Sequence, residues 1–177
     1  AMKILALDLG TKTGFALEAD NYPLACGTYE LASKKDLAFD KERRLDRRGD
    51  IRFSRLVYWL RGVCRQFEPD LIVFEDVQFA STSIQAHLWA SFRAAVWLMR
   101  TEFNVETECC PVATLKKFAT GSGAADKDAM ARYLTQNPRF ELRAKKIFDT
   151  VTGQTLDDNA VDALHLLKWA KRLKKTA

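Results

Sequence analysis

Four acidic residues on three separate stretches are the side chains of this sequence best suited to chemistry. Asp8 and Glu75 each follow directly on four apolar residues, and Asp158 and Asp162 lie four residues apart near the C-terminal end. A cluster of partly buried carboxylates is tolerated mainly when divalent cations neutralise it, because an isolated buried charge is strongly unfavourable. Two Mg²⁺ ions held by carboxylates promote in-line attack on a phosphodiester. The four acids therefore predict a metal-dependent nuclease, with all four as catalytic residues and metal ligands.

The neighbouring residues show which of these acids could have an ordinary structural role and which one indicates a functional site. The turn at residues 10–14, which follows Asp8, suits a plain hairpin as well as a phosphate-binding loop, and Glu75 could end its strand in solvent. Asp158 lies near the predicted start of a helix, where the macrodipole favours an acid. Asp162 shares the helical face of Asp158 but is surrounded by apolar residues, so neither exposure to solvent nor the helix macrodipole accounts for an acid at this position. An acid inside an apolar stretch indicates a functional site.

Basic residues around a glycine-rich turn predict a phosphate clamp. Lys116 and Lys117 precede the turn at residues 121–123, and Lys127 follows it at the predicted start of the next helix. Lysines and the free backbone N–H groups of a helix N-terminus both attract phosphate. Taken alone, such a run of basic residues is also typical of a solvated surface. The prediction of a phosphate clamp therefore depends on the acids expected nearby.

The remaining candidate groups favour structural roles. His165 falls on the same helical face as the last two acids and could act as a base, but a single histidine in a helix core usually packs. The tryptophans occupy apolar positions of predicted helices, and we expect all four in the core: Trp59, Trp89, Trp97 and Trp169.

The composition fits one globular domain with a polyanionic partner. The 177 residues carry a net charge of +5, and basic residues crowd positions 34–48 and the C-terminal end. The four cysteines form no Cys-x-x-Cys pair, which argues against zinc and against a disulfide framework. No stretch suits a membrane span or a secretory leader, so we expect a cytoplasmic protein of a bacterial or phage-infected cell. We take Ala1 as a remnant of tag removal and place the domain at 2–177.

Hydrophobic periodicity predicts a mixed α/β domain. Three strands in close succession indicate an antiparallel meander, and two later strands alternate with helices. The polar segment 32–44 is expected to be a loop. We expect strands at 2–9, 13–18, 24–31, 70–77 and 104–110, and helices at 46–67, 81–103, from 111 beyond 119, 126–135, 140–150 and 157–174. The order predicts one sheet with helices on both faces.

Taken together, these stretches resemble the RuvC-type Holliday junction resolvases of the RNase H-like superfamily. The resemblance rests on four segments in order, at 8–16, 74–77, 116–127 and 158–163, and spans nearly the whole chain. The compact Asp-Asp-Asn before the last acid is similar to phage or prophage members. The resemblance implies a five-stranded RNase H-like sheet (three antiparallel strands, then two parallel), two Mg²⁺ ions replaceable by Mn²⁺, a homodimer, and resolution of four-way DNA junctions by paired symmetric nicks. The residues expected to touch DNA are Thr11, Lys12, Gln78, Phe79, Lys116, Lys117 and Lys127.

Two departures from the family pattern bear on the site. The bacterial members commonly place their last two acidic ligands three residues apart, where this chain has Asn159 before Asp162; Asp158 is four residues before it. We favour Asp158 as the ligand, because Mg²⁺ prefers anionic oxygen. The bacterial members also carry an aromatic residue three positions after the strand glutamate. That position is Gln78 here, with Phe79 next to it.

Three other functions compete with junction resolution. The same ions could serve an RNase H-like nuclease acting on flaps, replication forks or RNA-containing substrates. A sugar-kinase or actin-like ATPase shares the Asp-x-Gly-Thr loop but needs two such domains, for which 177 residues are too few. A non-catalytic junction-binding protein would have no need of the intact set of carboxylates.

Overall fold

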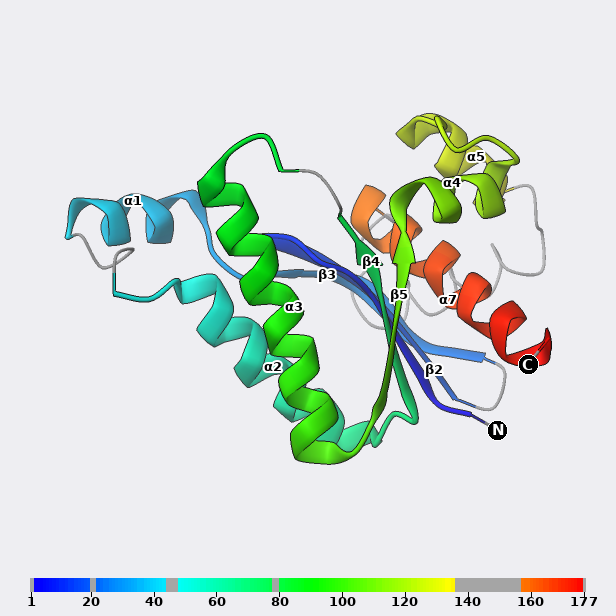
Figure 1. Cartoon of the computed structure of the whole chain (residues 1–177), viewed down its shortest axis with the longest axis horizontal. Coiled ribbons are helices and arrows are strands. Elements are labelled where there is room, and N and C mark those ends of the chain that lie inside the picture. The colour runs from blue at the N-terminus through cyan, green and yellow to red at the C-terminus, as the bar shows by residue number, and fades with distance from the viewer. Residues whose placement is uncertain (1, 20–21, 44–47, 78–79, 136–156, 177) are drawn as a thin grey trace.

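A five-stranded mixed sheet runs through the computed structural model, which describes residues 2–19, 22–43, 48–77, 80–135 and 157–176 (Figure 1). The strands lie in the order β3-β2-β1-β4-β5. The first three form the antiparallel meander, and β4 and β5 run parallel to β1. Their bounds are β1 Ile4–Asp8, β2 Lys12–Ala19, β3 Tyr22–Glu30, β4 Leu71–Asp76 and β5 Glu106–Pro111. The predicted fold class is confirmed.

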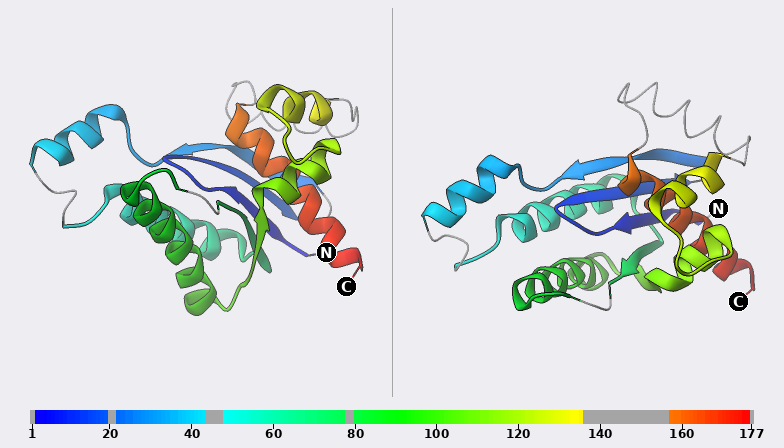
Figure 2. Two further views of the ribbon diagram at one scale, coloured as in Figure 1. Left: turned by 45° about the horizontal axis from the view of Figure 1, so that its top comes forward. Right: turned by 90° about the horizontal axis from the view of Figure 1, so that it is seen from above.

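Two long helices cover one face of the sheet, as the views in Figure 2 show. α2 spans Ile51–Phe67 and α3 spans Ser83–Phe103. Alternate strand residues, among them Leu5, Leu7 and Phe74, point to this side and form one core cluster with both helices. Asp50 caps the start of α2, which therefore begins at Ile51, five residues after Asp46, the start expected from periodicity.

The other face of the sheet carries the C-terminal helices. α7, Asp158–Thr176, crosses the sheet, and α4, Val112–Thr120, and α5, Lys127–Thr135, pack beside it. Ile4, Ala6 and Val73 point to this side and share a second core cluster with α7. Asp157 and Asp126 accept backbone hydrogen bonds at the starts of α7 and α5 and so cap these helices.

The polar segment expected to be a loop contains a helix instead. α1 spans Lys34–Glu42 and begins with a capping box, in which Ser33 and Asp36 exchange hydrogen bonds. This local signal outweighed the polar composition. Trp97 also differs from expectation, because half of its surface is exposed on α3. The helix expected at 140–150 lies outside the described residues. No helix in the described ranges combines the length and the apolar character that crossing a membrane requires.

Candidate metal-dependent nuclease site

The ends of β1 and β4 place two carboxylates side by side. Leu7 lies opposite Phe74 in the parallel ladder, so Asp8, the last residue of β1, and Glu75, the last but one of β4, lie on neighbouring strands one residue further along. Side chains alternate between the faces of a strand, so both acids point to the α7 side. Asp76 points to the opposite side and pairs with Arg93 of α3. The carboxyl ends of parallel strands are a common place for a functional site.

The start of α7 brings a third carboxylate to this sheet end. Asp157 caps the helix: its Oδ1 accepts the backbone N–H of Ala160 at 3.0 Å and the hydroxyl of Thr28 at 2.5 Å. The helix then lies directly on β2, because Gly14 has no side chain; a β-carbon there would stand 2.0 Å from the carbonyl oxygen of Asn159. This seat places Asp162, in the second turn of α7, above the strand ends.

The pKa shifts of these three acids indicate that their charges act on one another. Burial raises the pKa of Asp8 well above its usual value, and the charges of Glu75 and Asp162 raise it further. Burial, and then Asp162, raise the pKa of Glu75 to about 7. Burial raises the pKa of Asp162 to about 6, with Lys127 opposing the shift. Each group is held where its charge is unfavourable, which is the condition that a bound cation relieves.

The fourth predicted ligand, Asp158, lies at the rim of this cluster. Its carboxylate is exposed and pairs with Lys127, whose Nζ lies 3.1 Å from Oδ2. Asp158 raises the pKa of Asp162, whereas the main charges that raise the pKa of Asp8 are those of Glu75, Asp162 and Asp157. The structure therefore groups Asp8, Glu75 and Asp162, with Asp158 next to the last of them.

The three lysines predicted as a phosphate clamp divide into two groups. Lys116 lowers the pKa of both Glu75 and Asp162, and Lys127 lowers that of Asp8, so both lie near the carboxylates. Lys117 lines a separate groove between α4 and α7 together with Phe118, Trp169 and Arg172. Neighbouring positions on a helix point about 100° apart, which explains why one lysine faces the cluster and the next does not.

The turn after Asp8 is tied into the scaffold. The hydroxyl of Thr11 accepts a hydrogen bond from Arg52 at 3.2 Å, and its carbonyl accepts the N–H of Leu31 at 2.8 Å. Lys12 is exposed at the start of β2. Arg52 also donates hydrogen bonds to both carboxylate oxygens of Asp50. The remaining two predicted DNA contacts, Gln78 and Phe79, lie outside the described residues.

Other polar groups on α7 and β2 have structural roles. His165 is buried, and its Nε2 lies 2.8 Å from the carbonyl oxygen of Met130, so it joins α7 to α5 rather than to the carboxylates. Thr13 is fully buried and donates to the carbonyl of Gly10 at 2.8 Å. Sequence reasoning missed the helix seat at Gly14, although a glycine within a strand is itself a signal of close backbone approach.

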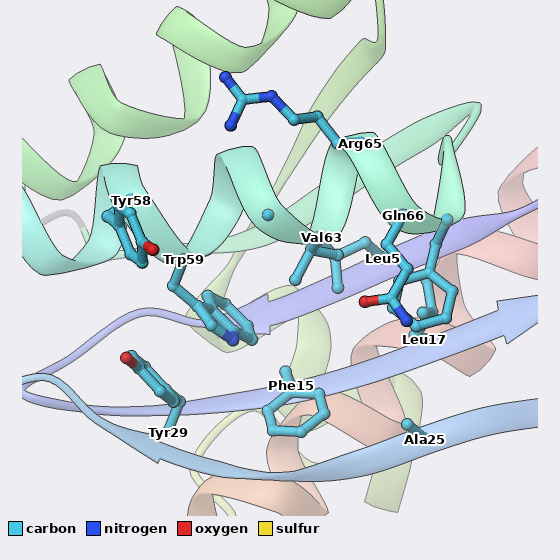
Figure 3. Close-up of a pocket in the computed structure, with 12 residues that line it drawn as sticks. Leu5, Phe15, Leu17, Ala25, Tyr29, Tyr58, Trp59, Val63, Arg65 and Gln66 are labelled. Atoms are coloured by element: carbon cyan, nitrogen blue, oxygen red, sulfur yellow. The ribbon is translucent and has the colours of Figure 1, made fainter.

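A hollow of about 390 Å³ lies on the opposite side of the sheet from the carboxylates, between α2 and the antiparallel strands (Figure 3). Trp59 stacks on Tyr29, with ring centroids 5.0 Å apart, and meets Phe15 edge-on at 5.4 Å. None of the twelve residues that line this hollow is acidic. The chemistry of the carboxylates is therefore confined to the α7 side.

Comparison with solved structures shows the same architecture in junction-cleaving proteins. Thermus thermophilus RuvC in complex with a Holliday junction substrate superposes with a TM-score of 0.65 at 18% identity, over 94% of this chain and 90% of that one. The chain has the fold of the RuvC-type Holliday junction resolvases. The yeast mitochondrial Holliday junction resolvase gives a TM-score of 0.59 at 13% identity, covering 98% and 81% of the two chains. The fowlpox virus resolvase, solved with Holliday junction DNA, gives 0.58 at 14%, covering 97% and 99%. No protein-family model and no curated protein sequence matches the chain.

Within this RuvC-type fold, the donor set fits a hard divalent cation. The three neighbouring side chains, Asp8, Glu75 and Asp162, offer only carboxylate oxygens, which suit Mg²⁺ and Mn²⁺ rather than zinc. In the part of the chain that the structure describes, no three Asp, Glu, His or Cys side chains are already grouped closely enough to hold one ion. The raised pKa values of Asp8, Glu75 and Asp162 indicate that added positive charge would be favourable near them.

Proposed function

We propose that the chain is a divalent-metal-dependent endonuclease that resolves four-way DNA junctions. The observation that carries this proposal is the meeting of Asp8, Glu75 and Asp162 at one end of the sheet, where like charge and burial raise their pKa values. The fold supports the choice of substrate, because two of the similar solved structures contain Holliday junction DNA.

The carboxylates would hold the metal ions. Asp8, Glu75 and Asp162, with Asp158 at the rim, would bind two Mg²⁺ ions, for which Mn²⁺ would substitute. A pair of ions held there would supply an activated water and stabilisation of the leaving 3′ oxygen. The close contact of α7 with Gly14 would set the distance between Asp162 on the helix and Asp8 and Glu75 on the strands. Small errors in such positioning are costly in rate.

The lysines would bind the phosphates of the scissile strand. Lys116 and Lys127 lie near the carboxylates and are the cations that partly offset their charge. The ion pair between Lys127 and Asp158 is exposed, so DNA could displace it at little cost. On DNA binding, Lys127 would exchange this carboxylate for a phosphate, which leaves Asp158 free to contact a metal ion.

A homodimer would provide the two active sites that paired symmetric nicks require. The outer face of α3 supports this proposal. Trp97 is 52% exposed there, and Ala90 and Ala94, about two turns and one turn before it on the same face, are also exposed. Small residues flanking an exposed tryptophan would let two α3 helices approach closely about a two-fold axis.

Substrate choice tests the proposal against its main alternative. Equal concentrations of a synthetic four-way junction, a 5′ flap, a splayed duplex and an RNA–DNA hybrid are incubated with the protein, with Mg²⁺ or with EDTA. We expect Mg²⁺-dependent cleavage of the junction at symmetric positions and much slower cleavage of the other substrates. Preferential cleavage of the hybrid or the flap would replace junction resolution with an RNase H-like or flap nuclease function.

A further inference from the structure

The helix α1 adds nothing to either core, yet it occupies a definite place beside the carboxylate cluster. None of its residues is buried, and it projects away from the body of the molecule (Figures 1 and 2). It follows β3, whose last residue, Glu30, pairs with Lys12 at the start of β2, in the turn that follows Asp8. The helix therefore extends outward from the end of the sheet at which the acids meet.

The base of α1 is fixed to that turn. Arg55 donates from Nη1 to the carbonyl of Leu31 at 2.9 Å and to Oδ2 of Asp36 at 3.0 Å. The N–H of Leu31 in turn donates to the carbonyl of Thr11 at 2.8 Å. The capping box at Ser33 orders the first turn of the helix. These bonds give α1 a set direction relative to the active site.

The charges of α1 are sorted between its two sides. Asp36 and Asp40 lie one turn apart, and both act on Arg55, so the acidic side faces the body. Three exposed lysines, Lys34, Lys35 and Lys41, lie away from that stripe, with the exposed acid Glu42 among them. Arg43, the C-cap residue, continues the stripe of Asp36 and Asp40. Arg43 also lies over the ring of Phe39, with 4.8 Å from its guanidinium carbon to the centroid.

We propose that α1 is a DNA-binding arm that contacts the phosphate backbone of a duplex leaving the cleavage site. The inference rests on the proposed function, because it assumes that branched DNA lies over the carboxylates. Nine residues of helix span roughly 13 Å, which matches about four base pairs of duplex rise. The exposed lysines suit a polyanion; Asp36 and Asp40 are turned inward, and Glu42 is the one acid of α1 exposed among the lysines.

Salt-dependent binding tests the arm directly. The variant K34Q/K35Q/K41Q removes three cations from α1, and the control R65Q/R100Q/K175Q removes three exposed cations from the last turns of α2, α3 and α7. Binding to a fluorescent four-way junction with long arms is measured in EDTA at increasing salt. We expect the arm variant to bind roughly tenfold more weakly at 0.1 M salt, with a slope of log affinity against log salt smaller by about 2 to 3.

Three comparisons give each outcome a meaning. Thermal melting of the arm variant should match wild type, because α1 has no buried residue. The variant K34R/K35R/K41R keeps the three positive charges and should bind the junction as the wild type does. If wild type binds and nicks the junction while the arm variant keeps its affinity and salt slope, or the control loses as much, the arm is refuted and the proposed function stands. If wild type neither binds nor nicks the junction, both proposals fail.

Discussion

The carbonyl oxygen of Asn159 occupies the space that a side chain at Gly14 would need: a β-carbon there would lie 2.0 Å from it. Gly14 is also the residue opposite Asp8 in the β1–β2 ladder. One glycine therefore sets how close the start of α7 comes to the strand end that carries a predicted metal ligand. The distance between Asp162 and Asp8 depends on this contact.

Replacing Gly14 with alanine should displace α7 and impair the site. Overpacking of this kind costs roughly 1–3 kcal/mol, and we expect a matching loss in denaturant-induced unfolding. Nicking should fall at least tenfold at a temperature where the variant remains folded. Gly62→Ala is the control, because its β-carbon would meet nothing within 4 Å on the exposed side of α2. Alanine there should be neutral or stabilising by up to about 1 kcal/mol. Wild-type stability and rate for Gly14→Ala would show that α7 is seated differently.

The metal-free protein should lose stability as the pH rises. The pKa of Glu75 is raised from 4.5 to about 7 and that of Asp162 from 3.8 to about 6. A carboxyl with a raised pKa stabilises the folded state below its unfolded pKa, and this stability disappears as the pH rises through the folded value. Melting temperatures in EDTA should therefore fall between pH 5 and pH 8, and the increase caused by Mg²⁺ should be largest at pH 8.

Glu75→Gln isolates the contribution of one group to this profile. We expect it to raise the melting temperature of the metal-free protein at pH 8, to leave it nearly unchanged at pH 5, and to reduce the response to Mg²⁺. Glu30→Gln, on the exposed end of β3, should leave the profile of the wild type unaltered. A melting temperature that is independent of pH in the wild type, or a destabilised Glu75→Gln at pH 8, would contradict the electrostatic account.

Asp158 is tested by comparison with its neighbours. If it completes the metal site, Asp158→Asn should lower the nicking rate by two orders of magnitude or more while junction binding persists. Asp157→Asn should cost on the order of 1 kcal/mol of stability as a weakened helix cap. Lys127→Gln, which removes the ion-pair partner, completes a double-mutant cycle with Asp158→Asn. Asp158→Asn and Lys127→Gln could instead each lower the nicking rate slightly and equally, with no further decrease in the double variant. That result would mean that Asp158 serves only in the ion pair.

The exposed face of α3 should hold the dimer together. Trp97→Glu introduces a charge into that face and should shift the protein from dimer to monomer in sedimentation velocity, with nicked but unresolved junctions accumulating. Tyr58→Glu, which alters an 80% exposed residue of α2, is the control and should leave the dimer intact. A wild type that sediments as a monomer, or a Trp97→Glu variant that remains dimeric, would place the interface elsewhere or remove it.

The parts of the site that local sequence determines were predictable. Asp8 and Glu75 were found because each ends an apolar run, and Asp162 because it interrupts an apolar helix. The direction of a side chain at a helix surface depends on tertiary packing, so the sequence did not separate Lys116 from Lys117. Nor did it reveal that the outer face of α3 leaves Trp97 exposed.

The helix α1 was missed for a different reason. Its composition is that of a solvated loop, and its order comes from the pairing of Ser33 with Asp36 and from Arg55, which follows nineteen residues after that aspartate. A contact of that range cannot be read from hydrophobic periodicity. The seat of α7 on Gly14 is equally long-range, because it joins β2 to the last helix.

Cleavage by Asp8→Asn measures the central claim most directly. The wild type and the variant are compared on one four-way junction, with nicking followed in Mg²⁺ and binding followed by gel shift in Ca²⁺. The account predicts symmetric nicks by the wild type in Mg²⁺ or Mn²⁺ and none in EDTA. It predicts no detectable nicking by Asp8→Asn, with its junction affinity within a few fold of wild type. Near-normal turnover by Asp8→Asn, or robust cleavage in EDTA, would show that the three carboxylates are not the nuclease site.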